Sequence, residues 1–136
     1  MYEHKIAVVI LSDLLDWQKL NVTAFLASSI AIALPQTHGA PLVSASGTPY
    51  LPFIKHPILI YEAESGEQLR RAFIRASDRG LFIGIYTKEL FTTKNEHENL
   101  SEIARFSDSD LNLAGIILYG LNKNVDKATD KLKFHR

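Results

Sequence analysis

The chain contains no cysteine among its 136 residues. This absence excludes disulfide bonds, thiol nucleophiles and cysteine-based zinc sites, and it suits a reducing compartment. Net charge is missing too, because 15 acidic residues balance 15 basic ones. A neutral molecule has no long-range field that would draw in nucleic acid non-specifically, although a local basic face remains open.

Long apolar segments are also lacking. The apolar run 22–34, which carries no charge, is well short of the roughly 20 residues that a membrane span needs. The apolar N-terminal run is too short for a signal peptide and is stopped by Asp13. We therefore expect a cytoplasmic protein without membrane contact, in which run 22–34 belongs to a buried helix. The length predicts a single domain, 1–136.

The common catalytic signatures do not occur. The sequence has no G-x-S-x-G elbow, no glycine-rich phosphate loop and no H-E-x-x-H motif. Its histidines are scattered without the spacing of metal ligands; they are His4, His38, His56, His97 and His135. We expect no metal ion and no cofactor, so candidate chemistry has to be located from position in the fold.

Apolar runs and capping signals predict alternating strands and helices. Strands are expected at 5–11, 58–63, 81–87 and 113–120, and helices at 17–34, 65–80, 95–106 and 122–132. This alternation predicts an α/β three-layer sandwich with a mixed, mostly parallel sheet of about four strands flanked by helices. The proline-rich segment 36–57 is expected to be a long connection with a short edge strand near 41–45.

Polar residues at the helix starts refine this prediction. Ser65 and Gln68 have the spacing of a capping box, and Asn95 is expected to cap the third helix. Asp16 is the natural N-cap of the first helix. Trp17, in the first turn of that helix, is expected to pack in the core.

Ligands of open α/β sheets bind outside the carboxyl ends of the strands. The stretch SDLLDWQKLNV, residues 12–22, follows the first strand and supplies polar side chains at such an end. Groups after the third strand and at the start of the last helix are expected to join them, with lysines attracting an anion. The predicted ligand-binding residues are Asp13, Lys19, Asn21, Thr87, Asp126 and Lys127, and the candidate catalytic residues are Lys19 and Asp13. In the structural alternative, the aspartates end a strand or cap a helix, and Lys19 is solvated.

Two stripes of basic residues recur at helical spacing. They are Arg71, Arg75 and Arg79 on the second helix, and Lys123, Lys127 and Lys131 on the last. Each could follow a phosphate backbone. Interspersed acidic residues favour solvated helix faces instead.

Three runs carry a family resemblance: KIAVVILSDLLDWQKLNVTAFLASSIA, RAFIRASDRGLFIGIYTKELF and GLNKNVDKATDKLKFH. Together they resemble the domain of unknown function 2000 family, which has no assigned activity. More distantly, Asp13, Leu14, Lys19 and the final run resemble type II peptidyl-tRNA hydrolases. That second resemblance implies a four-stranded mixed sheet flanked by helices, often in a dimer.

The chain departs from the hydrolases after the third strand, where those enzymes carry an acidic residue and a threonine. Thr87 and Phe91 stand near these two positions here. Lys19 could steady an oxyanion, whereas Glu89 is the substitute for activating water. Three functions stay open: binding of a small anionic or RNA-derived ligand, hydrolysis of peptidyl-tRNA or a related ester, and a non-catalytic oligomeric interaction module. The expected partners are tRNA or a small anionic ligand, and a second copy in a homodimer.

Overall fold

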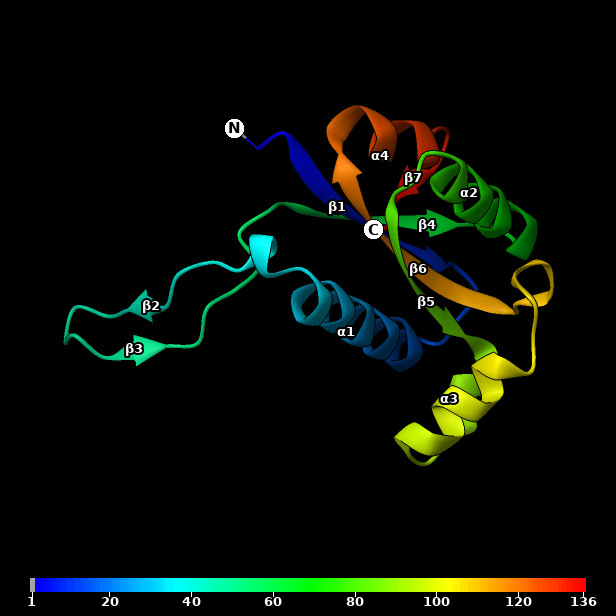
Figure 1. Ribbon diagram of the computed structural model, residues 1–136, viewed down its shortest axis with the longest axis horizontal. Coiled ribbons are helices and arrows are strands. Elements are labelled where there is room, and N and C mark those ends of the chain that lie inside the picture. Colours follow the sequence, from blue (N-terminus) through cyan, green and yellow to red (C-terminus); the bar gives the residue numbers. More distant parts are fainter. Residues whose placement is uncertain (1) are drawn as a thin grey trace.

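The structure is a computed structural model, and it describes residues 2–136. Five strands form one mixed sheet in the order β5-β6-β1-β4-β7 (Figure 1). Their bounds are His4–Leu11 for β1, Ile58–Ala63 for β4, Phe82–Thr87 for β5, Leu113–Leu121 for β6 and Lys133–Phe134 for β7. The α/β fold expected from the sequence is therefore present.

Helices cover both faces of this sheet. Helix α1 (Asp16–Ala33) packs on one face, and α2 (Gly66–Asp78) and α4 (Asn122–Ala128) pack on the other (Figure 1). The remaining helix, α3 (Glu96–Ala104), lies beyond the edge of the sheet. Short 3-10 turns occur at Pro35–Thr37, Lys88–Thr92 and Asp108–Asp110.

The strand directions correct the expectation of about four mostly parallel strands. Only β1 and β4 pair in parallel, whereas β6 runs antiparallel to both β1 and β5, and β7 runs antiparallel to β4. Because β5 and β6 are antiparallel neighbours, the link between them leaves and re-enters the sheet at the same end, and α3 in this link has no buried residue. The C-terminal tail adds β7 as the fifth strand.

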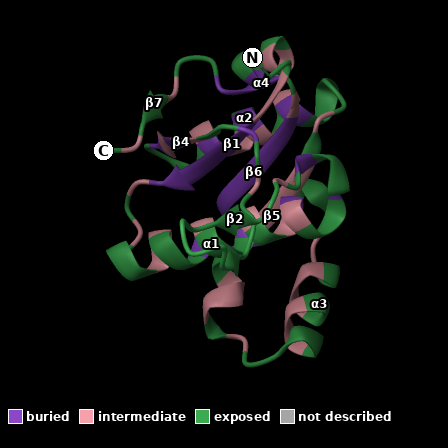
Figure 2. Cartoon of the chain, turned by 90° about the vertical axis from the view of Figure 1, so that its left-hand side faces the viewer, coloured by how far each residue is buried: buried purple, intermediate pink, exposed green. Residues whose placement is uncertain are grey.

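Strand β1 lies at the centre of the sheet and is buried on both faces, as its continuous apolar run predicts. Ile6, Val8 and Ile10 pack toward α1, whereas the alternate residues of the strand pack toward α2 and α4. Figure 2 shows this core as the purple band through β1 and β6. Because successive side chains of a strand point to opposite faces of the sheet, β1 contributes to the hydrophobic core on both sides.

Helix α1 approaches the sheet closely at two glycines. A Cβ atom on Gly84 would lie 2.6 Å from the Ser29 Oγ atom, and one on Gly115 would lie 2.8 Å from the Val22 Cγ1 atom. The buried line of the helix is Val22, Leu26 and Ile30. Gly115 of β6 thus makes room for this line, and Gly84 of β5 makes room for the neighbouring Ser29.

The opposite side of α1 is open, which corrects the expectation of a buried helix. The side chain of Ile32 is 82% exposed, and Trp17, Leu20 and Phe25 are exposed as well. Trp17 is therefore not a core residue. The predicted N-cap was also wrong, because Leu15 holds that position and its N–H group donates to the Gln18 Oε1 atom (3.0 Å).

The caps of α2 and α3 agree with their sequence signals more closely. The Ser65 Oγ atom accepts from the Gln68 N–H group (3.1 Å), although the Gln68 side chain returns to Glu64 and not to Ser65. The Asn95 side chain accepts from the Glu98 N–H group (2.9 Å). Helix α3 has no buried residue, and its Leu100 is exposed.

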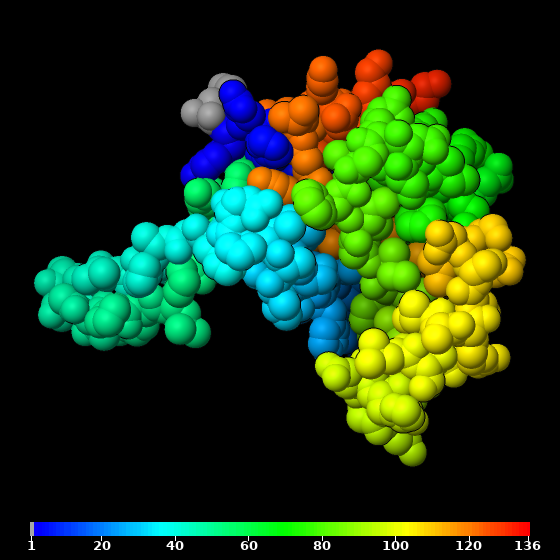
Figure 3. All heavy atoms as spheres, viewed as in Figure 1, coloured from blue at the N-terminus to red at the C-terminus, as the bar shows by residue number. Residues whose placement is uncertain are grey.

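The proline-rich segment forms a projecting hairpin. Strands β2 (Leu42–Val43) and β3 (Pro49–Tyr50) pair with each other in a sheet of their own, so the predicted edge strand does not join the main sheet. Every residue from 40 to 53 is exposed. We call residues 40–53 the arm, and it stands away from the body of the molecule (Figures 1 and 3).

Candidate functional site

The predicted site residues do not all lie at one end of the sheet. Strands β1 and β5 finish at the same end of the sheet, where Asp13 and Thr87 lie. Helix α4 begins at the opposite end of the sheet, because β6 runs antiparallel to β1 and pairs Leu121 with His4. Asp126 and Lys127 are therefore far along the sheet from Asp13. The expectation that the last helix completes this cleft was wrong.

The other four predicted residues differ in their surroundings. Asp13 is exposed and Thr87 is buried. Lys19 is half-buried, and within residues 2–136 it forms no ion pair with a carboxylate. Asn21 is exposed and lines a groove between α1 and α3.

Glu89, the candidate for activating water, lies in the turn after β5. Its Oε1 atom accepts a hydrogen bond from the Asn112 amide (3.3 Å). Its Oε2 atom is buried and has no partner among residues 2–136. The carboxylate therefore points toward the start of β6 and keeps one oxygen free.

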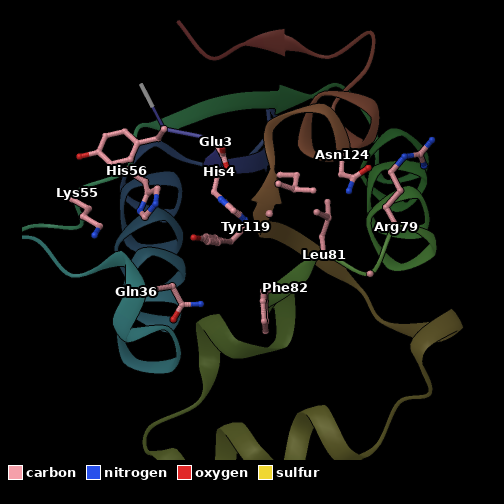
Figure 4. A pocket seen from close by; sticks show the side chains of 14 residues that line it. Glu3, His4, Gln36, Lys55, His56, Arg79, Leu81, Phe82, Tyr119 and Asn124 are labelled. Atoms are coloured by element: carbon pink, nitrogen blue, oxygen red, sulfur yellow. The ribbon is translucent and has the colours of Figure 1, made fainter.

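A pocket of about 580 Å³ lies at the opposite end of the sheet, where β1 and β5 begin and β6 ends (Figure 4). Five aromatic or imidazole rings form much of its wall, and they come from four separate segments of the chain. These are Tyr2 and His4 at the start of β1, His56 just before β4, Phe82 on β5 and Tyr119 on β6. We call this cavity the ring pocket.

Strand pairing explains how the rings meet. Tyr119 is the direct partner of both Ile6 and Phe82, and His4 lies two residues before Ile6, on the same face of β1. The Tyr119 ring consequently stacks on His4, with centroids 5.4 Å apart. The edge contact between His56 and Tyr119 has a centroid distance of 5.3 Å.

His56 is the most unusual group in the ring pocket. Its side chain is only 9% exposed, and its Nδ1 atom has no hydrogen-bond partner among the described residues. Burial, together with the charges of Lys55 and His4, lowers the pKa of His56 below its usual value. The ring is therefore held neutral near pH 7, with its buried Nδ1 atom left without a partner among the described residues.

Burial also raises the pKa of the Tyr119 hydroxyl, so this group stays protonated at neutral pH. Lys55 and Arg79 lie at two sides of the ring pocket, and Glu3 is the acidic residue in its lining (Figure 4). The Gln36 amide is a further polar group of the lining. The pocket therefore combines ring surfaces, neutral hydrogen-bonding groups and an excess of positive charge.

Sequence reasoning missed the ring pocket because its residues are far apart in the chain. In the sequence, His4 and His56 are isolated histidines without metal-ligand spacing. The available signal was Tyr119, a polar ring inside the otherwise apolar run LAGIILYG. A hydroxyl in such a strand needs a partner or an opening.

The groove between α1 and α3 has a volume of about 660 Å³. Its apolar lining comes from α1, from the end of β5 and from the turn after β5, and it consists of Trp17, Phe25, Ile32, Tyr86, Leu90 and Phe91. The Trp17 and Phe91 rings meet edge to face, with centroids 5.9 Å apart. We call this cavity the groove.

The arginine stripe on α2 makes contacts within the chain. Arg71 pairs with Glu67 (2.9 Å), and the Arg75 guanidinium donates to the Asp130 carbonyl oxygen (3.3 Å). Arg79 donates to the Arg75 carbonyl oxygen (3.3 Å). These contacts suit a solvated helix face better than a surface that follows a phosphate backbone.

Within residues 2–136, no group of three or more His, Asp or Glu side chains is placed to hold a metal ion. No helix in that part of the chain is both long enough and apolar enough to cross a membrane.

Comparison with known proteins gives a family and a fold. No curated protein matches the chain. A solved structure of a protein of unknown function from Agrobacterium tumefaciens is 34% identical in sequence, with a TM-score of 0.94 and coverage of 100% of both chains. The family model described as "Protein of unknown function (DUF2000)" matches residues 4–136. The chain therefore belongs to the DUF2000 family.

Proposed function

We propose that the protein binds a small anionic ligand with a planar ring, in the ring pocket. The observation that carries this proposal is the His56 Nδ1 atom, which is buried and unpaired at the pocket wall. An unsatisfied buried polar atom costs free energy, and a ligand donor or acceptor would remove that cost. The ligand class is the one expected from the sequence, but the site lies at the other end of the sheet.

The charge of the lining favours an anion. Lys55 and Arg79 supply two positive charges against one carboxylate, Glu3. Both cations are exposed, so they can turn toward a bound molecule without losing a buried ion pair. Acidification would add a further charge at His56, which makes anion binding stronger at lower pH.

The shape of the lining favours a planar group. His4 and Phe82 line the cavity with their rings, and the nearly buried Tyr119 ring contacts both of them. Offset stacking on such rings adds binding energy beyond simple burial of area. The volume of about 580 Å³ is in the range of small-molecule sites.

A thermal-shift and calorimetry experiment tests this proposal. Benzoate and adenosine monophosphate carry a ring and an anion, whereas acetate and inorganic phosphate carry only the anion. We expect at least one of the first pair to raise Tm and bind with 1:1 stoichiometry, and His56→Ala to weaken that binding tenfold or more. His97→Ala, an exposed histidine on α3, is the matched control and should leave it unchanged. Absence of binding by both ring-containing anions would refute the proposal.

The second candidate function is hydrolysis of peptidyl-tRNA or a related ester, at a site near Lys19 and Glu89 at the other end of the sheet. The free, buried Oε2 atom of Glu89 favours it, because a carboxylate oxygen of this kind can accept a proton from water. Release of peptide from peptidyl-tRNA is the measurement. We expect Glu89→Gln and Lys19→Ala each to reduce turnover by two orders of magnitude or more. Turnover that survives both substitutions, or is absent from the wild type, excludes this mechanism.

A further inference from the structure

The arm presents apolar side chains to solvent without any contact that explains them. Leu51 is 84% exposed and Phe53 is 71% exposed, and Leu42, Val43 and Tyr50 are exposed too. Two-residue strands such as β2 and β3 do not form a hairpin that is stable by itself in water. The arm therefore needs a surface to pack against.

The arm has a defined position in a homologue as well. Residues 40–53 are about a tenth of the chain. Each residue contributes at most its own share to a TM-score, so the value of 0.94 over both complete chains requires part of the arm to superpose. The position of that part is thus shared by two sequences with 34% identity.

The arm and the exposed side of α1 belong to one stretch that has no charge. No Asp, Glu, Lys or Arg occurs between Lys19 and Lys55, although such residues make up 22% of the chain. Proteins normally place charges on exposed strands and helix faces to prevent association. Their absence from two exposed surfaces indicates that both surfaces are covered.

We propose that two copies of this chain form a dimer in which the arm of each copy lies in the groove of the other. The groove supplies an apolar floor at Trp17, Phe25 and Phe91. An uncharged arm brings no charge that would have to be desolvated there. The arrangement is closed and two-fold, because each copy offers one arm and receives one.

A second copy fits these observations better than a different protein does. The arm and the groove occur once per chain, so a reciprocal pair covers both surfaces on both copies. A foreign protein seated in the groove would leave the arm in water, and one that held the arm would leave the groove open. Figure 3 shows the arm and α3 projecting away from the body, with α1 between them.

Sedimentation and light scattering of the full chain test the dimer. We expect the wild type to be a dimer at micromolar concentration. The arm variants Leu51→Glu and Phe53→Glu and the groove variants Phe25→Glu and Ile32→Glu should each raise the dimer Kd at least a hundredfold. All four side chains are exposed, so circular dichroism should show folded protein. Ile74→Glu, an exposed apolar residue on α2, is the control and should remain dimeric.

A mixing experiment distinguishes an arm in a groove from arm-to-arm or helix-to-helix contacts. An arm variant still has an intact groove, and a groove variant still has an intact arm. Mixing Leu51→Glu with Ile32→Glu therefore restores one of the two contacts, and heterodimers should form between chains that are monomeric alone. A monomeric wild type, dimers that survive the arm or the groove variants, or a mixture without heterodimers would each overturn the proposal.

Discussion

Lys5 on β1 and Asp126 on α4 form an ion pair that ties the last helix to the beginning of the central strand. The Lys5 side chain is 18% exposed, whereas that of Asp126 is 57% exposed. The contact therefore has one partner that is mostly withdrawn from water. It also explains why Asp126 cannot take part in a site beside Asp13, at the other end of β1.

We expect Asp126→Ala to lower the free energy of unfolding by about 1 kcal/mol, because Lys5 would keep its charge without a partner. Urea unfolding at low and high salt measures this change, and salt should reduce it. Glu64→Ala is the control, since Glu64 and Lys133 are 3.7 Å apart and both more than half exposed. That change should stay within about 0.5 kcal/mol of zero. Equal losses in the two variants would contradict the argument.

The lowered pKa of His56 predicts a pH-dependent stability. The unfolded chain binds a proton at His56 near its usual pKa of about 6.5, whereas the folded chain does so only at lower pH. The unfolded state therefore holds more protons once the pH falls below about 6.5, and the folded state loses stability there. Above about pH 6.5, protonation of His56 no longer reduces the free energy of unfolding.

Unfolding free energies measured between pH 5 and pH 8 check this prediction. His56→Phe keeps a ring among Tyr2, His4 and Tyr119 but cannot titrate, so part of the loss on acidification should disappear. His97→Phe, at an exposed position of α3, should retain the wild-type pH dependence. A His56→Phe curve parallel to that of the wild type would show that the imidazole is not responsible.

Gly84 and Gly115 set the distance between α1 and the sheet. We expect Gly84→Ala to destabilise the fold by about 1–3 kcal/mol, because its Cβ would lie 2.6 Å from the Ser29 Oγ atom and 2.7 Å from the Ile117 Cγ2 atom. Gly66→Ala is the comparison, since a Cβ there meets nothing within 4 Å at the start of α2. That variant should be neutral or up to about 1 kcal/mol more stable. A harmless Gly84→Ala would mean that α1 can lift from the sheet at little cost.

The exposure of Trp17 gives a further test of α1. We expect Trp17→Ala to cost about 1 kcal/mol, well below the roughly 3–5 kcal/mol of a buried tryptophan. Its remaining packing is the edge contact with Phe91. Leu26→Ala, which removes a buried side chain of the same helix, should cost about 2–5 kcal/mol. Both changes are measured in the Ile32→Glu background, so that self-association does not add to the result.

Local signals predicted the elements of this fold well. The apolar run of β1 predicted a buried strand, and Ile6 to Leu11 are buried. The run ILIYEA predicted the bounds of β4, although only Tyr61 and Ala63 of that strand are buried. The Asn95 cap was confirmed because a side chain that accepts from the third residue after it needs no distant partner. Such features depend on a few neighbouring residues, which a single sequence displays.

Relations between distant segments were harder to predict. A link whose helix packs across the sheet makes the next strand parallel, whereas a link that stays at one end makes it antiparallel. The sequence of α3 contains apolar residues, as a packed helix would, but α3 does not pack on the sheet. The error in strand direction placed Asp126 at the wrong end. The ring pocket joins His4, His56 and Tyr119 through strand pairing, which no spacing in the sequence reveals. The exposed side of α1 looked like core because an apolar face has the same composition whether its own chain or another covers it.

The central position of β1 has a consequence for protein synthesis. The ribosome produces this strand first, but its neighbour β6 begins at Leu113, about a hundred residues later. At 5–20 residues per second, the nascent chain waits roughly 5–20 seconds before the middle of its sheet can close. Translation that stops before Leu113 leaves a polypeptide in which the apolar residues of β1 lack the cover of β6. We expect such fragments to depend on chaperones or to aggregate.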